Sequence, residues 1–168
     1  MARTVNMAAP ASLPSAQFLR ESEIRRGMEL LYFGHAHLIR TADDELAARG
    51  LGRAHHRALY FVARRPDLTV SDLLTLLSIT KQSLGRVLTE LTDRGLIEAR
   101  AGERDRRQRL LRLTPAGAAL EVELFDYIRR RMATAYARAG QQAVAGYWAV
   151  LEGLIDDDAR GQIDQLHR

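Results

Sequence analysis

The sequence contains no cysteine among its 168 residues. This absence excludes disulfide frameworks, thiol redox sensors, cysteine nucleophiles and every metal site built on thiolate ligands. No apolar run approaches the roughly 18 residues that a membrane span needs, and the first residues lack the apolar block of a secretory signal. We therefore expect a cytoplasmic protein that does not contact a membrane.

Lysine is nearly absent as well, since Lys81 is the only one and arginine supplies almost all of the basic charge. A genome rich in arginine codons is one explanation of this bias that involves no binding function. The positive charge is nevertheless concentrated, because the segment from Lys81 to Arg112 holds nine basic and five acidic residues, a difference equal to the whole formal net charge of +4. Arginine donates paired hydrogen bonds to phosphates, so this segment has the charge pattern of a nucleic-acid-binding surface.

The motifs of the common enzyme classes are missing. The sequence has no glycine-rich phosphate loop, no nucleophile elbow around a serine and no zinc motif of the His-Glu-x-x-His type. The acidic run at residues 156–158 is expected to be solvated. The histidine pairs His35/His37 and His55/His56 are two residues and one residue apart, and neither spacing aims both rings of a helix at one ion. We predict that the chain is not an enzyme and binds neither a cofactor nor a metal.

Length and composition suit one folded domain, because 46% of the residues are hydrophobic and 27% are charged. Residues 1–16 are rich in Ala, Pro and Ser without periodicity and are expected to form a mobile tail. Residues 17–168 are expected to form a single domain. In that domain 51–113 is the central part, and 17–50 and 114–168 are flanking helices.

Helical periodicity is clear in the flanking parts of the chain. A first helix is expected from Gln17 to about Arg49 and a second from Gly52 to Arg64. Thr114 and Pro115 are typical of a helix start, with a capping residue followed by proline at the first helical position. Gly140 divides the rest into two amphipathic helices. Together with the first helix they present more apolar surface than the central part can cover, which predicts a homodimer.

The stretch LTVSDLLTLLSITKQSLGRVLTELTDRGLIEAR, which begins at Leu68, predicts two helices joined by a tight turn. Ser71 can cap a short helix from Asp72 to Leu77, and Thr80 can cap a second helix that runs to about Arg94. The second helix has an apolar stripe made of Leu84, Val87, Leu88 and Leu91. Its polar side carries Lys81, Gln82, Ser83, Arg86 and Glu90.

A basic β-hairpin is expected after Gly95. Leu96 and Ile97 open one strand, Leu111 and Leu113 close the other, and the turn between them is charged. The five arginines from 104 to 112 repel one another unless phosphates neutralise them. Within this turn Asp105 can pair with Arg107 and fix its direction.

A helix-turn-helix followed by such a hairpin is a winged helix, so the predicted fold class is mainly α: a winged helix-turn-helix with a small β-hairpin wing and flanking dimerisation helices. In a winged helix the second helix enters the major groove of duplex DNA and the wing reaches an adjacent minor groove. Two alternatives stay open, a solvated helix pair that binds nothing and a winged-helix module that docks a protein. The docking module would not need so basic a wing. The predicted DNA-binding residues are Thr80, Lys81, Gln82, Ser83, Arg86, Arg104, Asp105, Arg106, Arg107 and Arg109.

From about Phe18 to Leu154 the chain resembles the multiple-antibiotic-resistance regulator (MarR) family. The resemblance rests on the wing and on the strand that leads into the next helix, at Asp105, Arg106, Arg107, Leu111, Leu113, Thr114 and Gly117. The stretch from Gly52 to Leu88 is similar to the PetP-like branch of that family. Two positions depart from the family pattern. Ser78 stands where a glycine is common in the turn, and Gly85 lies inside the second helix, where it costs about 1 kcal/mol relative to alanine unless it permits a close approach.

The resemblance implies a homodimeric, mostly helical regulator that binds pseudo-palindromic operator DNA and is released from it by a small molecule. It also implies that Arg107 is the arginine of the wing tip and that Asp105 holds it. Effectors of this family bind between the dimerisation helices and the winged part. The corresponding residues of this chain, for an aromatic or carboxylate effector, are His35, Arg40, His56, Leu59 and Tyr60.

Overall fold

The computed structural model describes residues 19–102 and 105–166. They fall into two compact units, of which the first ends at His37 and the second runs from Leu38 onward. Within the described residues the chain forms seven helices and three short strands, so the predicted mainly-α fold is confirmed. The expected N-terminal tail lies outside the described residues.

Helix α1 (Glu21–Ala48) continues from the first unit into the second. In the first unit its predicted apolar stripe is exposed, with half of Ile24 and two thirds of Met28 accessible to solvent. In the second unit Ala42 and Leu46 of the same helix are fully buried. The helix therefore contributes to a core only with its C-terminal part.

The helix-turn-helix is present as predicted. Helix α2 (Arg53–Arg64) is followed by α3 (Val70–Leu77) and α4 (Lys81–Asp93). Ser78, in the turn between α3 and α4, has a left-handed backbone conformation with φ 50° and ψ 44°. Glycine reaches this conformation without steric cost, which is the physical reason for a glycine at this position in the family that the chain resembles.

The helix caps agree with the sequence in one case and differ in the other. Thr80 caps α4 as predicted, its side-chain oxygen accepting a hydrogen bond from the Ser83 amide at 3.1 Å. The prediction that Ser71 caps α3 is wrong. The capping residue is Thr69, which accepts from the Asp72 amide, because the helix begins two residues earlier than expected.

The strands form one antiparallel sheet in the order β1-β3-β2, made of β1 (Leu68–Thr69), β2 (Ile97–Ala101) and β3 (Arg109–Leu113). The pairing of β2 with β3 confirms the predicted wing hairpin, with Ile97 opposite Leu113. Strand β1 was not predicted from the sequence. It has only two residues, and it is a strand because Leu68 lies opposite Leu111 of β3.

Three helices end the chain, where two were predicted. They are α5 (Pro115–Ala139), α6 (Gln141–Leu154) and α7 (Asp157–Leu166). Thr114 and Pro115 begin α5 as predicted, and Gly140 separates it from α6. The acidic run at 156–158 is exposed, as expected, but it also starts α7, because Asp156 Oδ1 accepts a hydrogen bond from the Ala159 amide at 2.7 Å. Carboxylates are favourable at a helix N-terminus, where the amide dipoles point outward.

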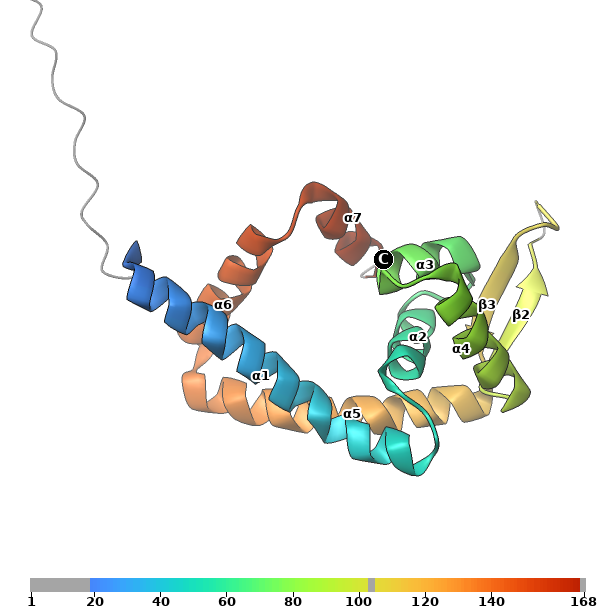
Figure 1. Cartoon of the computed structure of the whole chain (residues 1–168), viewed down its shortest axis with the longest axis horizontal. Coiled ribbons are helices and arrows are strands. Elements are labelled where there is room, and N and C mark those ends of the chain that lie inside the picture. Colours follow the sequence, from blue (N-terminus) through green and yellow to red (C-terminus); the bar gives the residue numbers. More distant parts are fainter. Residues whose placement is uncertain (1–18, 103–104, 167–168) are drawn as a thin grey trace, which may run out of the picture. The chain divides into compact units, whose positions relative to one another are not determined.

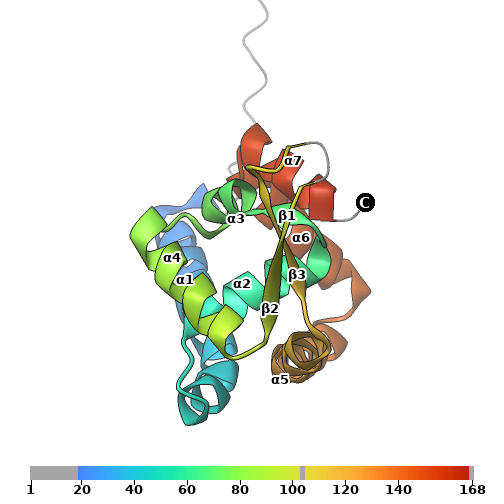
Figure 2. The same cartoon turned by 90° about the vertical axis from the view of Figure 1, so that its right-hand side faces the viewer.

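Helix α2 lies at the centre of the second unit and contacts α3, α4, α5 and β3 (Figures 1 and 2). The side chains that are fully buried around it come from every surrounding element: Leu46, Leu59, Val62, Leu68, Leu73, Leu77, Leu84, Leu91, Ile97, Leu111 and Leu124. Burial of each such leucine contributes about 1.5–3 kcal/mol to stability. This single core fixes α4 and the wing on the same small scaffold.

No helix in the described part of the chain is long and apolar enough to cross a membrane.

Candidate nucleic-acid interface

Helix α4 is held by one face and open on the other. Leu84, Val87 and Leu91 are buried in the core, as the apolar stripe predicted. The polar side chains of the helix are exposed: Lys81, Gln82, Ser83, Arg86 and Glu90. The anchored stripe therefore fixes the direction in which a row of cationic and hydrogen-bonding groups faces solvent.

The first turn of α4 is ordered by its own hydroxyl groups. The Thr80 hydroxyl donates to the Ser83 hydroxyl at 2.9 Å, and the Ser83 amide donates to the Thr80 hydroxyl at 3.1 Å. Both side chains are exposed. A helix N-terminus with free amides and the positive end of the helix dipole attracts anions such as phosphates.

Helix α2 ties both helices of the motif into place. His55 Nδ1 accepts a hydrogen bond from the Gly52 amide at 3.0 Å, so the neutral ring carries its proton on Nε2 and donates it to Glu90 of α4 at 2.9 Å. Arg57 donates to the carbonyl of Leu77 at 2.8 Å, at the end of α3. The His55 bond holds the C-terminal half of α4 and the Arg57 bond holds the end of α3, while the side chains in the N-terminal half of α4 stay exposed.

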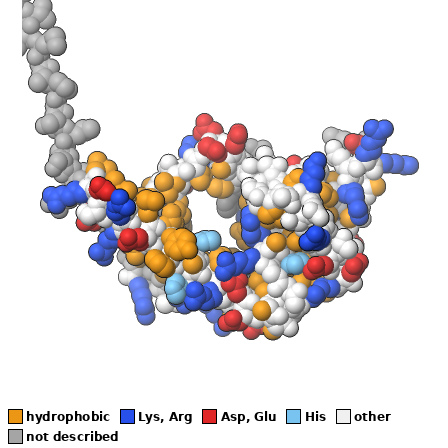
Figure 3. All heavy atoms as spheres, in the orientation of Figure 1, with side chains coloured by type: hydrophobic (Ala, Val, Ile, Leu, Met, Phe, Trp, Pro, Cys, Tyr) orange, Lys and Arg blue, Asp and Glu red, His pale blue; other side chains and the backbone are white. Residues whose placement is uncertain are grey.

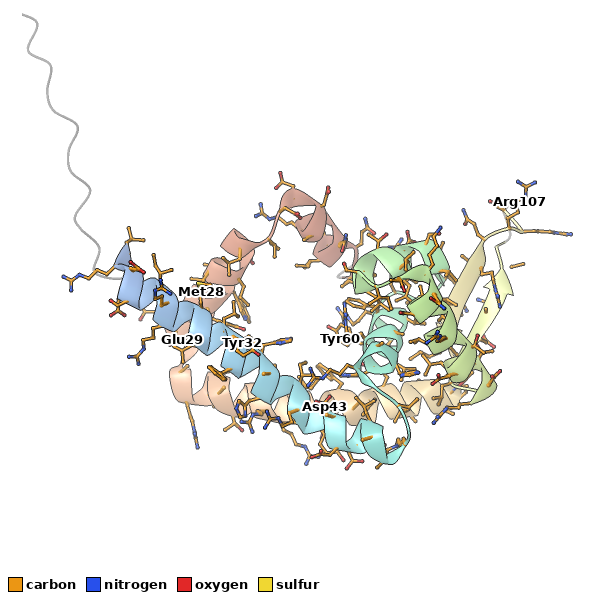
Figure 4. All side chains as sticks on the ribbon, viewed as in Figure 1. Met28, Glu29, Tyr32, Asp43, Tyr60 and Arg107 are labelled. Carbon is orange, nitrogen blue, oxygen red and sulfur yellow. The ribbon has the colours of Figure 1, made fainter. Side chains whose placement is uncertain are left out.

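The tip of the wing is exposed and basic. Arg106, Arg107 and Arg109 are all exposed, and basic side chains gather at the end of the wing (Figure 3). Arg107 points away from the body of the hairpin there (Figure 4). The sequence suggested that Asp105 pairs with the Arg107 guanidinium, but no such pair is among the described contacts. The Asp105 carboxylate instead accepts a hydrogen bond from the Arg107 backbone amide at 2.9 Å. Asp105 therefore shapes the turn. Arg104, also predicted to bind DNA, lies outside the described residues.

The base of the wing holds a cluster that the sequence analysis missed. Asp67, directly before β1, accepts hydrogen bonds from Arg112 of β3 and from Arg100 of β2. The two guanidinium groups, Arg112 above all, lower the pKa of Asp67 to about 2. The sequence around Asp67 signals only a turn, through the pair Pro66-Asp67. It does not reveal the two arginines, which are 33 and 45 residues further along the chain.

Comparison with known proteins supplies the identity that this geometry suggests. The sequence profile of the MarR family matches residues 49–108. The HTH-type transcriptional regulator PetP of Rhodobacter capsulatus is 46% identical over 149 residues, which are 89% of this chain and 90% of that protein. This chain belongs to the MarR family. It is a transcriptional regulator and not an enzyme, and the predicted similarity to PetP is confirmed.

Solved structures of the MarR family share the fold. A variant of MarR from E. coli, complexed with operator DNA, has a TM-score of 0.63 at 21% identity, covering 84% of this chain and all 100% of that one. BpsR of Bordetella bronchiseptica, whose DNA binding is regulated by 6-hydroxynicotinic acid, has a TM-score of 0.62 at 18% identity, covering 78% of this chain and 99% of that one. At these identities the likeness shows the winged-helix fold.

The five residues that the MarR resemblance suggested for an effector differ in burial and belong to two units. His35 is exposed and belongs to the first unit. In the second unit Arg40 is exposed, Tyr60 is half-buried and Leu59 is fully buried in the core. Tyr60 lies beside Phe125 of α5, with their ring centroids 6.4 Å apart, and the sequence analysis did not single out Phe125.

His56 is the one buried polar residue of the described core, and only 6% of it is exposed. Its Nε2 atom has no hydrogen-bond partner among the described residues. Burial lowers the pKa of His56, and the nearby Asp43 carboxylate opposes this shift. Hydrogen bonds from Arg53 lower the pKa of Asp43, and the charge of Arg40 acts in the same direction. Arg40, Asp43 and His56 thus form one local cluster.

Two hollows in the second unit include none of the five residues suggested for an effector. One, of about 410 Å³, lies at the base of the wing around Asp67. The other, of about 680 Å³, is open and lies beside Leu51, Leu96 and Leu120. Among the described residues no group of three His, Asp or Glu side chains is arranged to hold a metal ion.

Proposed function

We propose that this MarR-family regulator binds pseudo-palindromic operator DNA as a homodimer, with α4 of each protomer in a major groove and each wing in an adjacent minor groove. The observation that carries the proposal is the open N-terminal half of α4, held by its buried stripe on the same scaffold as the basic wing. Two-fold symmetry then places the two α4 helices about 10 base pairs apart or a multiple of that.

The proposed contacts divide into two kinds. Side chains at the start of α4 reach base edges and nearby phosphates, and wing side chains reach the minor groove and its phosphates. The first group is Thr80, Lys81, Gln82, Ser83 and Arg86. The second group is Arg104, Arg106, Arg107 and Arg109, with Asp105 shaping the turn.

The proposal of a homodimer is supported by apolar surface that one protomer leaves uncovered. No residue of α6 is buried, although Tyr147, Trp148, Val150 and Leu154 are large and apolar. The first unit adds exposed side chains on α1, among them Ile24, Met28, Leu31, Tyr32 and Phe33. Figure 4 labels Met28 and Tyr32 of this set. Soluble monomers rarely leave so many large apolar side chains of whole helices exposed, so residues 17–50 and 114–168 are the proposed dimerisation part.

The proposed effector is a small molecule that is aromatic or carries a carboxylate. Arg40 and His56 can meet its negative charge, and Tyr60 with Phe125 can contact its ring. To lower the affinity for DNA tenfold, the effector must bind the state that does not bind DNA more tightly than the DNA-binding state, by about 1.4 kcal/mol. By reciprocity DNA weakens binding of the effector by the same factor.

The DNA contact is tested with Arg107→Ala and a matched control, Arg131→Ala, which removes an exposed arginine of α5. Each phosphate contact contributes about 0.9 to the slope of log affinity against log salt, so losing one contact in each protomer should flatten the slope by about 1.8. The control should keep the parent slope. A parent slope in Arg107→Ala would favour the alternative of a protein-docking module.

Two further measurements test the rest of the proposal. Sedimentation should give a dimer, and a stable folded monomer at micromolar concentration would contradict it.

Calorimetry of a phenolic acid, with and without operator DNA, should give weaker binding in the presence of DNA. Equal affinities would refute gating by that ligand, and a full response in both Arg40→Ala and His56→Ala would place the pocket elsewhere.

A further inference from the structure

Asp67 joins the helix-turn-helix to the wing. It lies between α2 and β1 in the left-handed backbone region, with φ +65°. Its backbone amide donates to the carbonyl of Leu111 in β3 at 3.0 Å. The next residue, Leu68, pairs with Leu111 in the sheet and is fully buried. The hydrogen bond of its own amide and the burial of the next residue therefore fix the position of Asp67.

The Asp67 carboxylate binds an arginine from each strand of the wing. Oδ1 accepts from Arg112 Nε at 2.6 Å and from Arg100 Nη2 at 3.0 Å, and Oδ2 accepts from Arg112 Nη2. The Arg112 pair is bidentate, which restricts its orientation as well as its distance. One carboxylate thus connects β2 and β3 to the segment that precedes α3.

The two arginines would otherwise be available to DNA. About half of the Arg100 side chain and 43% of the Arg112 side chain remain exposed. Both lie on the strands that carry the wing tip, beside a hollow that Gly102 and Gln108 also line. Unpaired arginines at such a place contact phosphates whatever the base sequence, and such contacts raise affinity for every DNA equally.

We propose that Asp67 is a positioning residue that determines specificity: it fixes the direction of the wing and withholds Arg100 and Arg112 from DNA phosphates. The contacts of the wing are then concentrated at its tip, around Arg107. This inference rests on the proposed function, because it assumes that the wing contacts operator DNA. It adds a group that does not touch DNA and that acts through the two arginines it binds.

The decisive variant is Asp67→Asn. Asparagine has nearly the same shape and adopts the left-handed conformation readily, so the backbone is not strained, but it lacks the charge that holds both guanidinium groups. Affinity for the operator should fall because the wing is less fixed. Affinity for unrelated DNA should rise because two arginines are released, and the ratio of the two affinities should fall about tenfold.

The salt dependence separates this role from a merely structural one. If one or both released arginines in each protomer meet phosphates, the slope on unrelated DNA should steepen by about 1.8 to 3.6. A wing that is only loosened would lose contacts and flatten the slope. The triple variant Asp67→Asn, Arg100→Gln, Arg112→Gln has the loosened wing without the released arginines. Its slope should therefore be no steeper than that of the parent protein, and its affinity for the operator should stay low.

A second test does not depend on the stability of Asp67→Asn. Arg100→Gln alone leaves the bidentate Arg112–Asp67 pair in place and changes an exposed side chain that the proposal keeps away from DNA, so its salt slope on the operator should equal that of the parent protein. Arg107→Ala, measured beside it, should flatten the slope by about 1.8. Equal flattening in both variants would show that Arg100 binds phosphate, and it would overturn the proposal.

The outcomes distinguish this inference from the function on which it rests. If the parent protein fails to bind operator DNA, or if Arg107→Ala changes nothing, the proposed mode of DNA binding is wrong. If the parent binds and Arg107→Ala behaves as expected, an unchanged affinity ratio in Asp67→Asn refutes the role of Asp67 alone. Hydrogen exchange of the β3 amides reports, without DNA, how firmly the wing is held. The exchange should be faster in Asp67→Asn than in the parent protein.

Discussion

One substitution, glycine to alanine, should have opposite effects at two helices of this protein. Gly117 lies buried in the first turn of α5, and a Cβ atom there would be 1.9 Å from the carbonyl oxygen of Leu96 and 2.8 Å from its carbonyl carbon. Gly85 lies exposed inside α4, and a Cβ atom there would meet no heavy atom within 4 Å. We predict that Gly117→Ala destabilises the protein and that Gly85→Ala stabilises it.

The magnitudes follow from these surroundings. The obstacle at Gly117 is backbone, which cannot rotate away, and the Leu96 carbonyl also accepts a hydrogen bond from the Thr114 amide at 3.1 Å. Overpacking of this kind costs about 1–3 kcal/mol, and weakening a hydrogen bond adds about 1 kcal/mol, so the loss should be about 3 kcal/mol. At Gly85 alanine should gain about 1 kcal/mol, because glycine is the poorer helix former.

Thermal unfolding at a fixed protein concentration measures both effects, with concentration held constant because a dimer unfolds in a concentration-dependent way. For a chain of this length 1 kcal/mol corresponds to about 2–4 °C, so Tm should fall by about 6–12 °C in Gly117→Ala and rise by about 2–4 °C in Gly85→Ala. A Tm in Gly117→Ala at or above that of the parent would refute the reasoning. If Gly85→Ala is more stable but binds the operator less well, DNA approaches the backbone of α4 closely at this glycine.

Two other predictions concern pH and capping. Because burial lowers the pKa of His56, the unfolded chain takes up the proton first, so the free energy of unfolding should decrease as the pH falls below about 6.5, until the folded-state pKa is passed. Unfolding at pH 7.5 and 5.5 should show a smaller decrease in His56→Leu, and an equal decrease would contradict this assignment. Thr80→Ala, which removes the oxygen that caps α4, should cost about 1 kcal/mol in urea unfolding, whereas Thr80→Ser should cost far less.

The elements that the sequence predicted well are those with local signals. The start of α4 was predicted because Thr80 is a capping residue and the apolar residues after it follow the helical repeat. The start of α5 was predicted in the same way from Thr114 and Pro115. The wing hairpin was predicted from two apolar ends around a charged turn, and the pairing of Ile97 with Leu113 confirms it.

The elements that the sequence missed depend on distant partners or on weak signals. Strand β1 has two residues and exists through its pairing with β3, more than 40 residues further along the chain. Helix α7 follows α6 after a short break, where the acidic run was taken only as solvated surface. The hydrogen bond that the Arg107 amide donates to the Asp105 carboxylate depends on the backbone of the turn, which charge alone does not reveal.

The sequence by itself determined the winged helix-turn-helix, the family, and which face of α4 is polar, because capping, periodicity and charge act between residues that are close along the chain. Only the tertiary structure decided what each of several similar residues does. Gly117 is buried against Leu96, whereas Gly85 is exposed. Arg100 and Arg112 are bound by Asp67, whereas Arg107 is exposed. These differences arise from contacts between segments tens of residues apart, which form only when the helices and strands pack around α2.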